Sequence, residues 1–268
     1  MGSVAAAAPH ERQQVAPSSD EESVGTCCFG RNEDDYDAKI PIGSAPAYIR
    51  TGFVRKVYSL LVVQLLLTFM IALPFKQMST AWVMSHLWLY KLAVFGSLGL
   101  VVGVVCCCQQ AARTYPTNYM FLLLVTVCQA VAVGFITTRY SSNAVLLALA
   151  ATVVVFCGLT LYACFTKSDF TGFGPYLFAA LWGMISMSLV LMIFSMYMPI
   201  PATADKLFAV LGVILFSFYV VYDTQLIIGG DHKQHQFSVD DYVFAALNIY
   251  LDIINMFIYF LRIFGSRD

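Results

Sequence analysis

Charged side chains are scarce in this sequence. Only 12% of its 268 residues are Asp, Glu, Lys or Arg, whereas 59% are hydrophobic and the mean hydropathy is +0.74. A soluble globular domain carries about twice that share of charge. The composition therefore excludes a soluble protein and predicts an integral membrane protein that crosses the bilayer several times.

Other signals are missing as well. No N-x-[ST] sequon occurs, so nothing marks a glycosylated extracellular loop. No apolar core follows the initiator Met, so we expect no cleavable signal peptide, and the first span itself should direct insertion. The connections after residue 56 are too short for a soluble catalytic domain. We therefore expect the protein not to be an enzyme and to need no cofactor.

Long apolar stretches fill the chain from residue 57 onward. A membrane-spanning helix needs about 20 mostly apolar residues, and seven stretches of that length are present. The fold class predicted is all-α, a polytopic membrane protein built as a seven-transmembrane-helix bundle. The predicted spans are Val57–Phe75, Leu87–Cys108, Tyr119–Thr138, Ala144–Phe165, Pro175–Met198, Leu207–Ile228 and Tyr242–Phe264.

Residues 1–48 differ from the rest in composition. They contain few large apolar side chains and eight of the sixteen acidic residues, in runs such as "SSDEES" and "NEDDYD". Such a segment buries too little surface to offset its ordering entropy. We predict a disordered acidic tail over 1–48 and a membrane domain over 49–268. The negative sign of the tail excludes nucleic acid as a partner and leaves the lipid bilayer as the main one.

The orientation in the membrane depends on where Lys and Arg flank the spans. With seven full crossings the count is balanced, whereas a re-entrant last stretch would favour a cytosolic side for both termini. The cluster "RTGFVRK" flanks the first span, which usually dominates topology. We therefore expect a cytosolic N-terminus and leave the side of the C-terminus open.

Only two acidic residues lie within the predicted spans, Asp223 in "VVYDTQLII" and Asp252 in "NIYLDIINM". A carboxylate in hydrocarbon is costly, so such residues usually face the bundle interior and mark ion or proton pathways. Asn248 and Asn255 share a helix face with Asp252. Tyr222 and Gln225 flank Asp223 in sequence. We predict that four side chains make supporting polar contacts at this site: Asn248, Asn255, Tyr222 and Gln225.

The last two spans are joined by a short loop and run antiparallel, so the two aspartates can meet. Two carboxylates in low dielectric cannot both ionise cheaply, and we expect them to share one proton near neutral pH. Such a pair would sense pH, and its oxygens would suit a transient Ca²⁺ ion. The alternative is purely structural: each Asp hydrogen-bonds a neighbouring polar side chain and fixes helix packing.

Several motifs together resemble one family. They are "YIRTGFVRKVYSLLVVQLLLT", "TKSDFTGFGPYLFAAL", "VVYDTQLIIGG" and "DDYVFAALNIYLDIINMFIYFLRIFG". Over roughly residues 48–265 the chain resembles the Lifeguard branch of the transmembrane Bax inhibitor motif family. The resemblance implies a seven-helix bundle with the last helix central, a pH-sensitive calcium leak across an intracellular membrane, and suppression of cell death. It also implies that the sensor aspartates are Asp223 and Asp252.

The resemblance is incomplete at one place. Bacterial members have basic residues at the end of the second span, one of which pairs with the sensor. Here that stretch reads "CCCQQAAR", which leaves Arg113 as a displaced candidate for such a latch.

Three further function classes compete with the leak. An intramembrane aspartyl protease also pairs two acids, but Asp252 lacks the preceding G-x-G and no PAL sequence follows. A seven-helix receptor is disfavoured by the short loops. A non-conducting scaffold that binds death-pathway or calcium-release proteins stays open. The sequence is best interpreted as a calcium leak channel of endoplasmic reticulum or Golgi membranes, with calcium as the permeant ion, that regulates calcium homeostasis and suppresses apoptosis.

Overall fold

The computed structural model describes residues 42–107, 114–229, 235, 237–238 and 240–265. Within them lie eight α-helices and no β-strand. The helices are α1 (Ala47–Ala72), α2 (Thr80–Ser85), α3 (Leu87–Cys107), α4 (Thr117–Thr137), α5 (Ser142–Phe165), α6 (Gly174–Phe194), α7 (Ala202–Ile228) and α8 (Tyr242–Phe264). Short 3-10 turns occur at Ile42–Ser44, Leu73–Gln77 and Thr171–Phe173.

The helix boundaries follow local sequence signals. Proline lacks an N–H and has a fixed φ, so it suits the start of a helix; Pro46, Pro116 and Pro201 directly precede α1, α4 and α7. Before α5, the side chain of Ser141 accepts a hydrogen bond from the N–H of Ala144 at 3.3 Å. After α7, Gly229 has φ 61°, a left-handed conformation that favours glycine.

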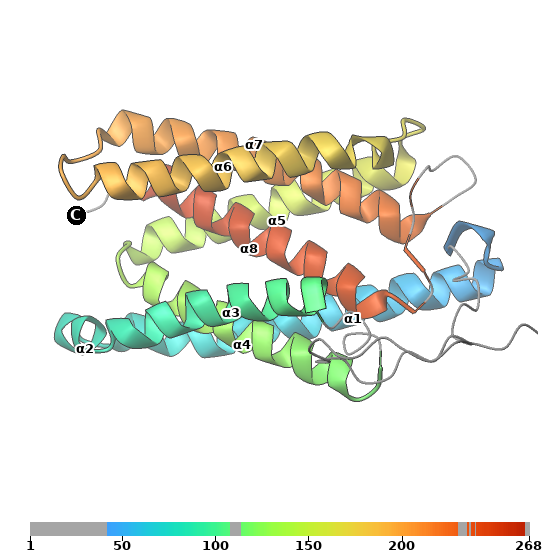
Figure 1. Ribbon diagram of the computed structural model, residues 1–268, viewed down its shortest axis with the longest axis horizontal. Helices are drawn as coiled ribbons and strands as arrows, with labels where there is room; N and C mark the ends of the chain where they lie inside the picture. The colour runs from blue at the N-terminus through green and yellow to red at the C-terminus, as the bar shows by residue number, and fades with distance from the viewer. Residues whose placement is uncertain (1–41, 108–113, 230–234, 236, 239, 266–268) are drawn as a thin grey trace, which may run out of the picture. The chain divides into compact units, whose positions relative to one another are not determined.

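The seven predicted spans are confirmed as helices long and apolar enough to cross a membrane. Figure 1 shows α8 crossing the bundle between the α6–α7 pair and the α3–α4 pair. The helix packs against α1, α4, α5 and α7, and buried side chains occur along its length from Val243 to Leu261. The last helix is therefore the central one, as expected.

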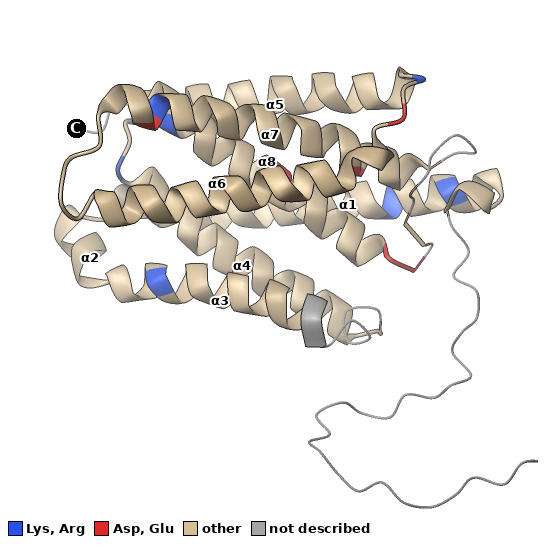
Figure 2. Ribbon diagram, turned by 45° about the horizontal axis from the view of Figure 1, so that its top comes forward, with Lys and Arg blue, Asp and Glu red and all other residues tan. Residues whose placement is uncertain are grey.

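The outer helices are apolar where they face lipid. Helix α6 has no buried residue, and side chains such as Trp182 and Met192 are exposed. In water this exposure would be unfavourable, but in a bilayer it is the expected surface of a spanning helix. Figure 2 shows the acidic and basic residues concentrated towards the ends of the helices, with long charge-poor stretches between them.

The first helix begins earlier than the predicted span. Hydropathy places the span from Val57, whereas α1 starts at Ala47. The described structure begins at Ile42, before the predicted domain boundary at residue 49. Ile42 is fully buried, and its N–H donates to the carbonyl of Phe237 at 3.0 Å. The 3-10 turn before α1 is thus held against the loop before α8, and the helix begins upstream of the apolar segment.

Two sequence predictions fall on residues outside the described part of the chain. Most of the predicted tail, residues 1–41, is not described. The candidate latch Arg113 also lies outside the described residues. Both remain predictions.

Candidate functional site

The two intramembrane aspartates lie on neighbouring helices at different depths. Asp223 is in the last part of α7, about 8 Å from its end at 1.5 Å per residue, and Asp252 is near the middle of α8. Their residues are 4% and 5% exposed, respectively. Helices α7 and α8 pack against each other, so the two carboxyl groups enter one interface.

The carboxyl groups of Asp223 and Asp252 interact electrostatically with each other. A carboxylate has only acceptor atoms, so a hydrogen bond between two carboxyl groups requires a proton on one of them. Within the described part of the chain, neither group forms an ion pair, and Oδ2 of Asp252 is buried without a hydrogen-bond partner. A shared proton between the two groups therefore stays a prediction, and it is the state that two buried acids without a basic partner favour.

Tyr219 is a third member of this site that sequence adjacency does not reveal. It interacts electrostatically with both aspartates. It precedes Asp223 by four residues and so lies on the same face of α7. Its ring also packs at 5.9 Å from that of Phe216. A search at helical spacing from Asp223 would have found it.

The other predicted polar residues have separate surroundings. Gln225 is fully buried and binds the loop between α5 and α6: its Oε1 accepts from the N–H of Phe170 at 2.8 Å, and its Nε2 donates to the carbonyl of Ser168 at 2.9 Å. Tyr222 interacts electrostatically with Asp223, while its hydroxyl lies beside the backbone of Gly174.

The two asparagines of α8 are half-buried. Asn255 donates from Nδ2 to the carbonyl of Leu251 in its own helix at 2.8 Å, and among the described residues no hydrogen bond joins Asn248 to either aspartate. Their role as supporting contacts therefore stays a prediction. Both share the face of Asp252 along the helix, as their spacing indicates.

A second polar set joins α1, α4 and α8 in the bundle core. The hydroxyls of Thr68 and Tyr250 are 2.8 Å apart, and Thr68 donates its own hydrogen to the carbonyl of Gln64 at 2.8 Å, so Tyr250 is the donor between them. Nε2 of Gln64 donates to the hydroxyl of Thr126 at 3.1 Å. Side-chain hydrogen bonds of this kind fix the packing of spanning helices. In the sequence, this polar set was signalled by the side-chain amide of Gln64 within the first apolar span.

The start of α8 is also held by polar contacts. Nζ of Lys56 lies 3.3 Å from the ring centre of Tyr242, and Nδ2 of Asn118 donates to the Tyr242 hydroxyl at 3.1 Å. A cation over an aromatic ring is attracted to its electron-rich face. The contacts tie α8 to α1 and α4, so the aspartate-bearing helix is fixed at its beginning as well as in the core.

No group of three or more His, Cys, Asp or Glu side chains that would hold a metal gathers among the described residues. Calcium takes about 6–8 oxygen ligands in stable sites. The pair of Asp223 and Asp252 alone offers too few, so only a passing calcium ion fits it, and that contact stays a prediction.

Comparison with known proteins shows a match to one family, described as "Inhibitor of apoptosis-promoting Bax1", over residues 50–268. Protein lifeguard 4 of Mus musculus is 34% identical over 86% of this chain and 91% of its own length. Protein lifeguard 3 of Homo sapiens is 34% identical over 82% of this chain and 70% of its own length. The Golgi anti-apoptotic protein of Vaccinia virus (strain Lister) is 32% identical over 86% of this chain and 92% of its own length.

Proposed function

The chain belongs to the Bax inhibitor family, and from that membership and the buried carboxyl pair we propose that it suppresses cell death by a pH-gated calcium leak. The protein is a multi-pass membrane protein. The observation that carries the gating part of the proposal is that the buried carboxyl groups of Asp223 and Asp252 interact across the α7–α8 interface.

The gate works through the shared proton. With the proton in place, the carboxyl groups attract each other and hold α7 against α8. When the proton leaves, two negative charges face each other, and at 4 Å and an effective dielectric constant of 20 they repel by about 4 kcal/mol. That repulsion separates the helices and exposes carboxylate oxygens, which attract a hard cation. The leak therefore rises as the pH rises.

The proposed location is an intracellular membrane, the endoplasmic reticulum or the Golgi. The name of the Vaccinia relative supports the Golgi. With the N-terminus in the cytosol, α7 ends on the cytosolic side, so Asp223 lies close to that surface and would sense cytosolic pH. Calcium stored in the lumen would then move down its gradient into the cytosol.

The test is calcium flux into liposomes that contain the purified protein, measured from pH 5 to 8. Wild type should show a flux that rises with pH. In Asp223→Asn the new amide donates to Asp252 without needing a proton, so the flux should lose its pH dependence; Asp252→Asn should do the same. Asp240→Asn is the matched control because Asp240 is an exposed acid between α7 and α8, and this variant should behave as wild type.

No flux above that of empty liposomes, from protein shown to be folded, would contradict the leak. The scaffold interpretation would then account for the family's anti-apoptotic role, and death-pathway or calcium-release proteins would be its partners. A flux that stays pH-dependent in both aspartate variants would refute the gate but leave the leak in place.

A further inference from the structure

A cavity of about 430 Å³ lies at the end of the bundle away from Asp223, between α3 and α4 on one side and α6 and α7 on the other, with α8 behind it. The volume lies within the range of small-molecule sites, about 300–1,000 Å³. Neither aspartate of the gate lines this cavity. Its walls are mostly apolar, with side chains such as Phe135, Leu191 and Ile258.

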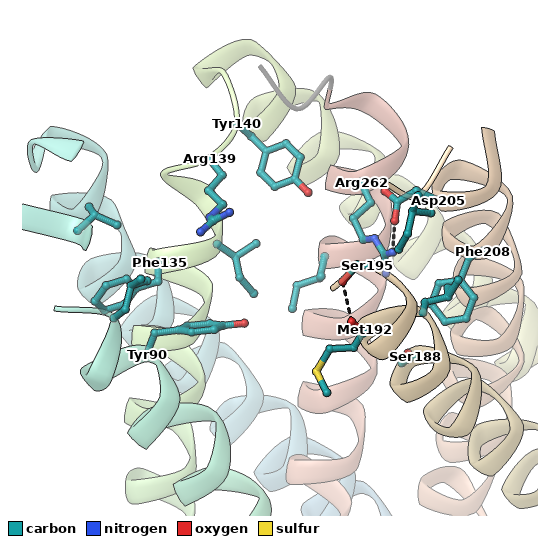
Figure 3. A pocket seen from close by; sticks show the side chains of 16 residues that line it. Tyr90, Phe135, Arg139, Tyr140, Ser188, Met192, Ser195, Asp205, Phe208 and Arg262 are labelled. Carbon is teal, nitrogen blue, oxygen red and sulfur yellow. Dashed lines mark hydrogen bonds and ion pairs between the residues drawn. The ribbon is translucent and has the colours of Figure 1, made fainter. Parts of the chain in front are cut away.

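Polar groups meet at one end of the cavity. Figure 3 shows the guanidinium of Arg139 and the hydroxyls of Tyr90 and Tyr140 directed into the cavity from the α3–α4 side. On the opposite side, Arg262 forms an ion pair with Asp205. The lining residues thus carry two guanidinium groups and one carboxylate.

The positive charge of Arg139 is left without an acidic partner in the described part of the chain. Arg262 pairs with Asp205 through Nη2. Among the described residues, its buried Nε has no hydrogen-bond acceptor. Guanidinium groups bind carboxylate and phosphate oxygens through directed, charge-assisted hydrogen bonds. The cavity therefore fits an oxyanion at its polar end.

The surroundings of the cavity indicate which kind of molecule supplies the oxyanion. The outer faces of α3 and α6 beside the cavity carry exposed apolar side chains, including Trp88 at 61% and Ile193 at 55% exposure. These faces contact lipid in a membrane, so a ligand reaches the cavity from the bilayer. The apolar walls match an acyl chain, and the arginine end lies where a spanning bundle meets the headgroup layer.

We propose that this cavity binds an anionic membrane lipid, whose headgroup oxyanion pairs with Arg139 and whose acyl chain lies along the apolar wall. Binding does not depend on the calcium leak, because Asp223 and Asp252 are outside the cavity. A bound lipid would link α3 and α4 to α6 and α7 across α8 at this end of the bundle.

Trp82 provides a local probe for the test. Its ring stacks at 6.3 Å from that of Phe135, which lines the cavity. A protein with Trp88→Phe and Trp182→Phe has Trp82 as its sole tryptophan, since the chain has 3 tryptophans. This protein is placed in liposomes with increasing fractions of brominated phosphatidylglycerol or brominated phosphatidylcholine, and quenching of Trp82 fluorescence is recorded.

The anionic lipid should quench Trp82 at a lower mole fraction than the zwitterionic lipid. Arg139→Gln should raise the half-quenching fraction of the anionic lipid about tenfold, because a charge-assisted hydrogen bond is lost. The matched control is Lys206→Gln, which removes an exposed positive charge from the same end of α7 without touching the cavity. It should keep the preference.

Three results would overturn the proposal. Equal quenching by the two lipids would mean that no anionic site exists. A preference for the anionic lipid that persists in Arg139→Gln would place the lipid elsewhere. Loss of the excess quenching when inorganic phosphate is added to the wild-type background would assign the site to a free oxyanion and not to a lipid.

Discussion

Removing the side-chain amide of Gln225 should loosen the connection between α5 and α6. The residue is fully buried, and it makes hydrogen bonds of 2.8 Å with the N–H of Phe170 and 2.9 Å with the carbonyl of Ser168. Each such bond contributes about 0.5–1.5 kcal/mol net. The variant Gln225→Met keeps nearly the same side-chain volume, so its cost isolates the two bonds at about 1–3 kcal/mol.

Two measurements check this prediction. Chemical unfolding in mixed micelles gives the change in the free energy of unfolding. Hydrogen exchange gives a local reading: the amide of Phe170 should lose protection in Gln225→Met, whereas the amide of Thr166, which donates to the carbonyl of Tyr162 at 2.9 Å, should keep it. Gln225→Ala should cost more than Gln225→Met because it also leaves a cavity.

A Gln225→Met variant with the unfolding free energy and the Phe170 exchange of wild type would contradict this prediction. The loop would then be held by other contacts, and the amide of Gln225 would be free to serve elsewhere, including beside Asp223 on the same helix.

Two other substitutions probe the packing around α8. Gly212→Ala should lower stability, because a Cβ there would lie 2.6 Å from ring atoms of Tyr259, whereas Gly158→Ala, with nothing within 4 Å, should not; thermal unfolding of the two variants in detergent compares them, and equal midpoints would contradict the expectation. Tyr250→Phe removes the hydroxyl that donates to Thr68 and should cost about 0.6–2 kcal/mol in the same assay, with an unchanged midpoint arguing against that bond.

The helical bundle was predictable from the sequence because hydropathy directly reports the main constraint on a spanning chain. The beginning of α1 was not, since hydropathy marks the edge of the apolar segment and not the end of the helix. Nor was α2, a helix of only 6 residues capped by Ser79, whose side chain accepts from the N–H of Trp82. Such a short element has no periodicity to detect.

The sequence was enough to predict that two acids on adjacent spans would pair. Whether their side chains meet depends on the register of α7 against α8, which the sequence does not show. The residues around Asp223 show that adjacency in the sequence does not identify the members of the site. Gln225 follows Asp223 by two residues, and a rotation of about 100° per residue turns it to another side of the helix. Tyr219, four residues before Asp223, shares its face. Helical spacing, applied consistently, identifies the third member of the site.

The most direct test of the central claim measures carboxyl protonation and calcium flux in the same sample. Infrared difference spectra of the protein in liposomes report the C=O band of a protonated carboxyl group, and calcium flux is measured in the same vesicles from pH 5 to 8. We predict that wild type shows such a C=O band, that Asp252→Asn lacks it, and that the wild-type band disappears over the pH range in which the wild-type flux rises. A flux that rises while that band stays unchanged would contradict the claim that the shared proton of Asp223 and Asp252 closes the path.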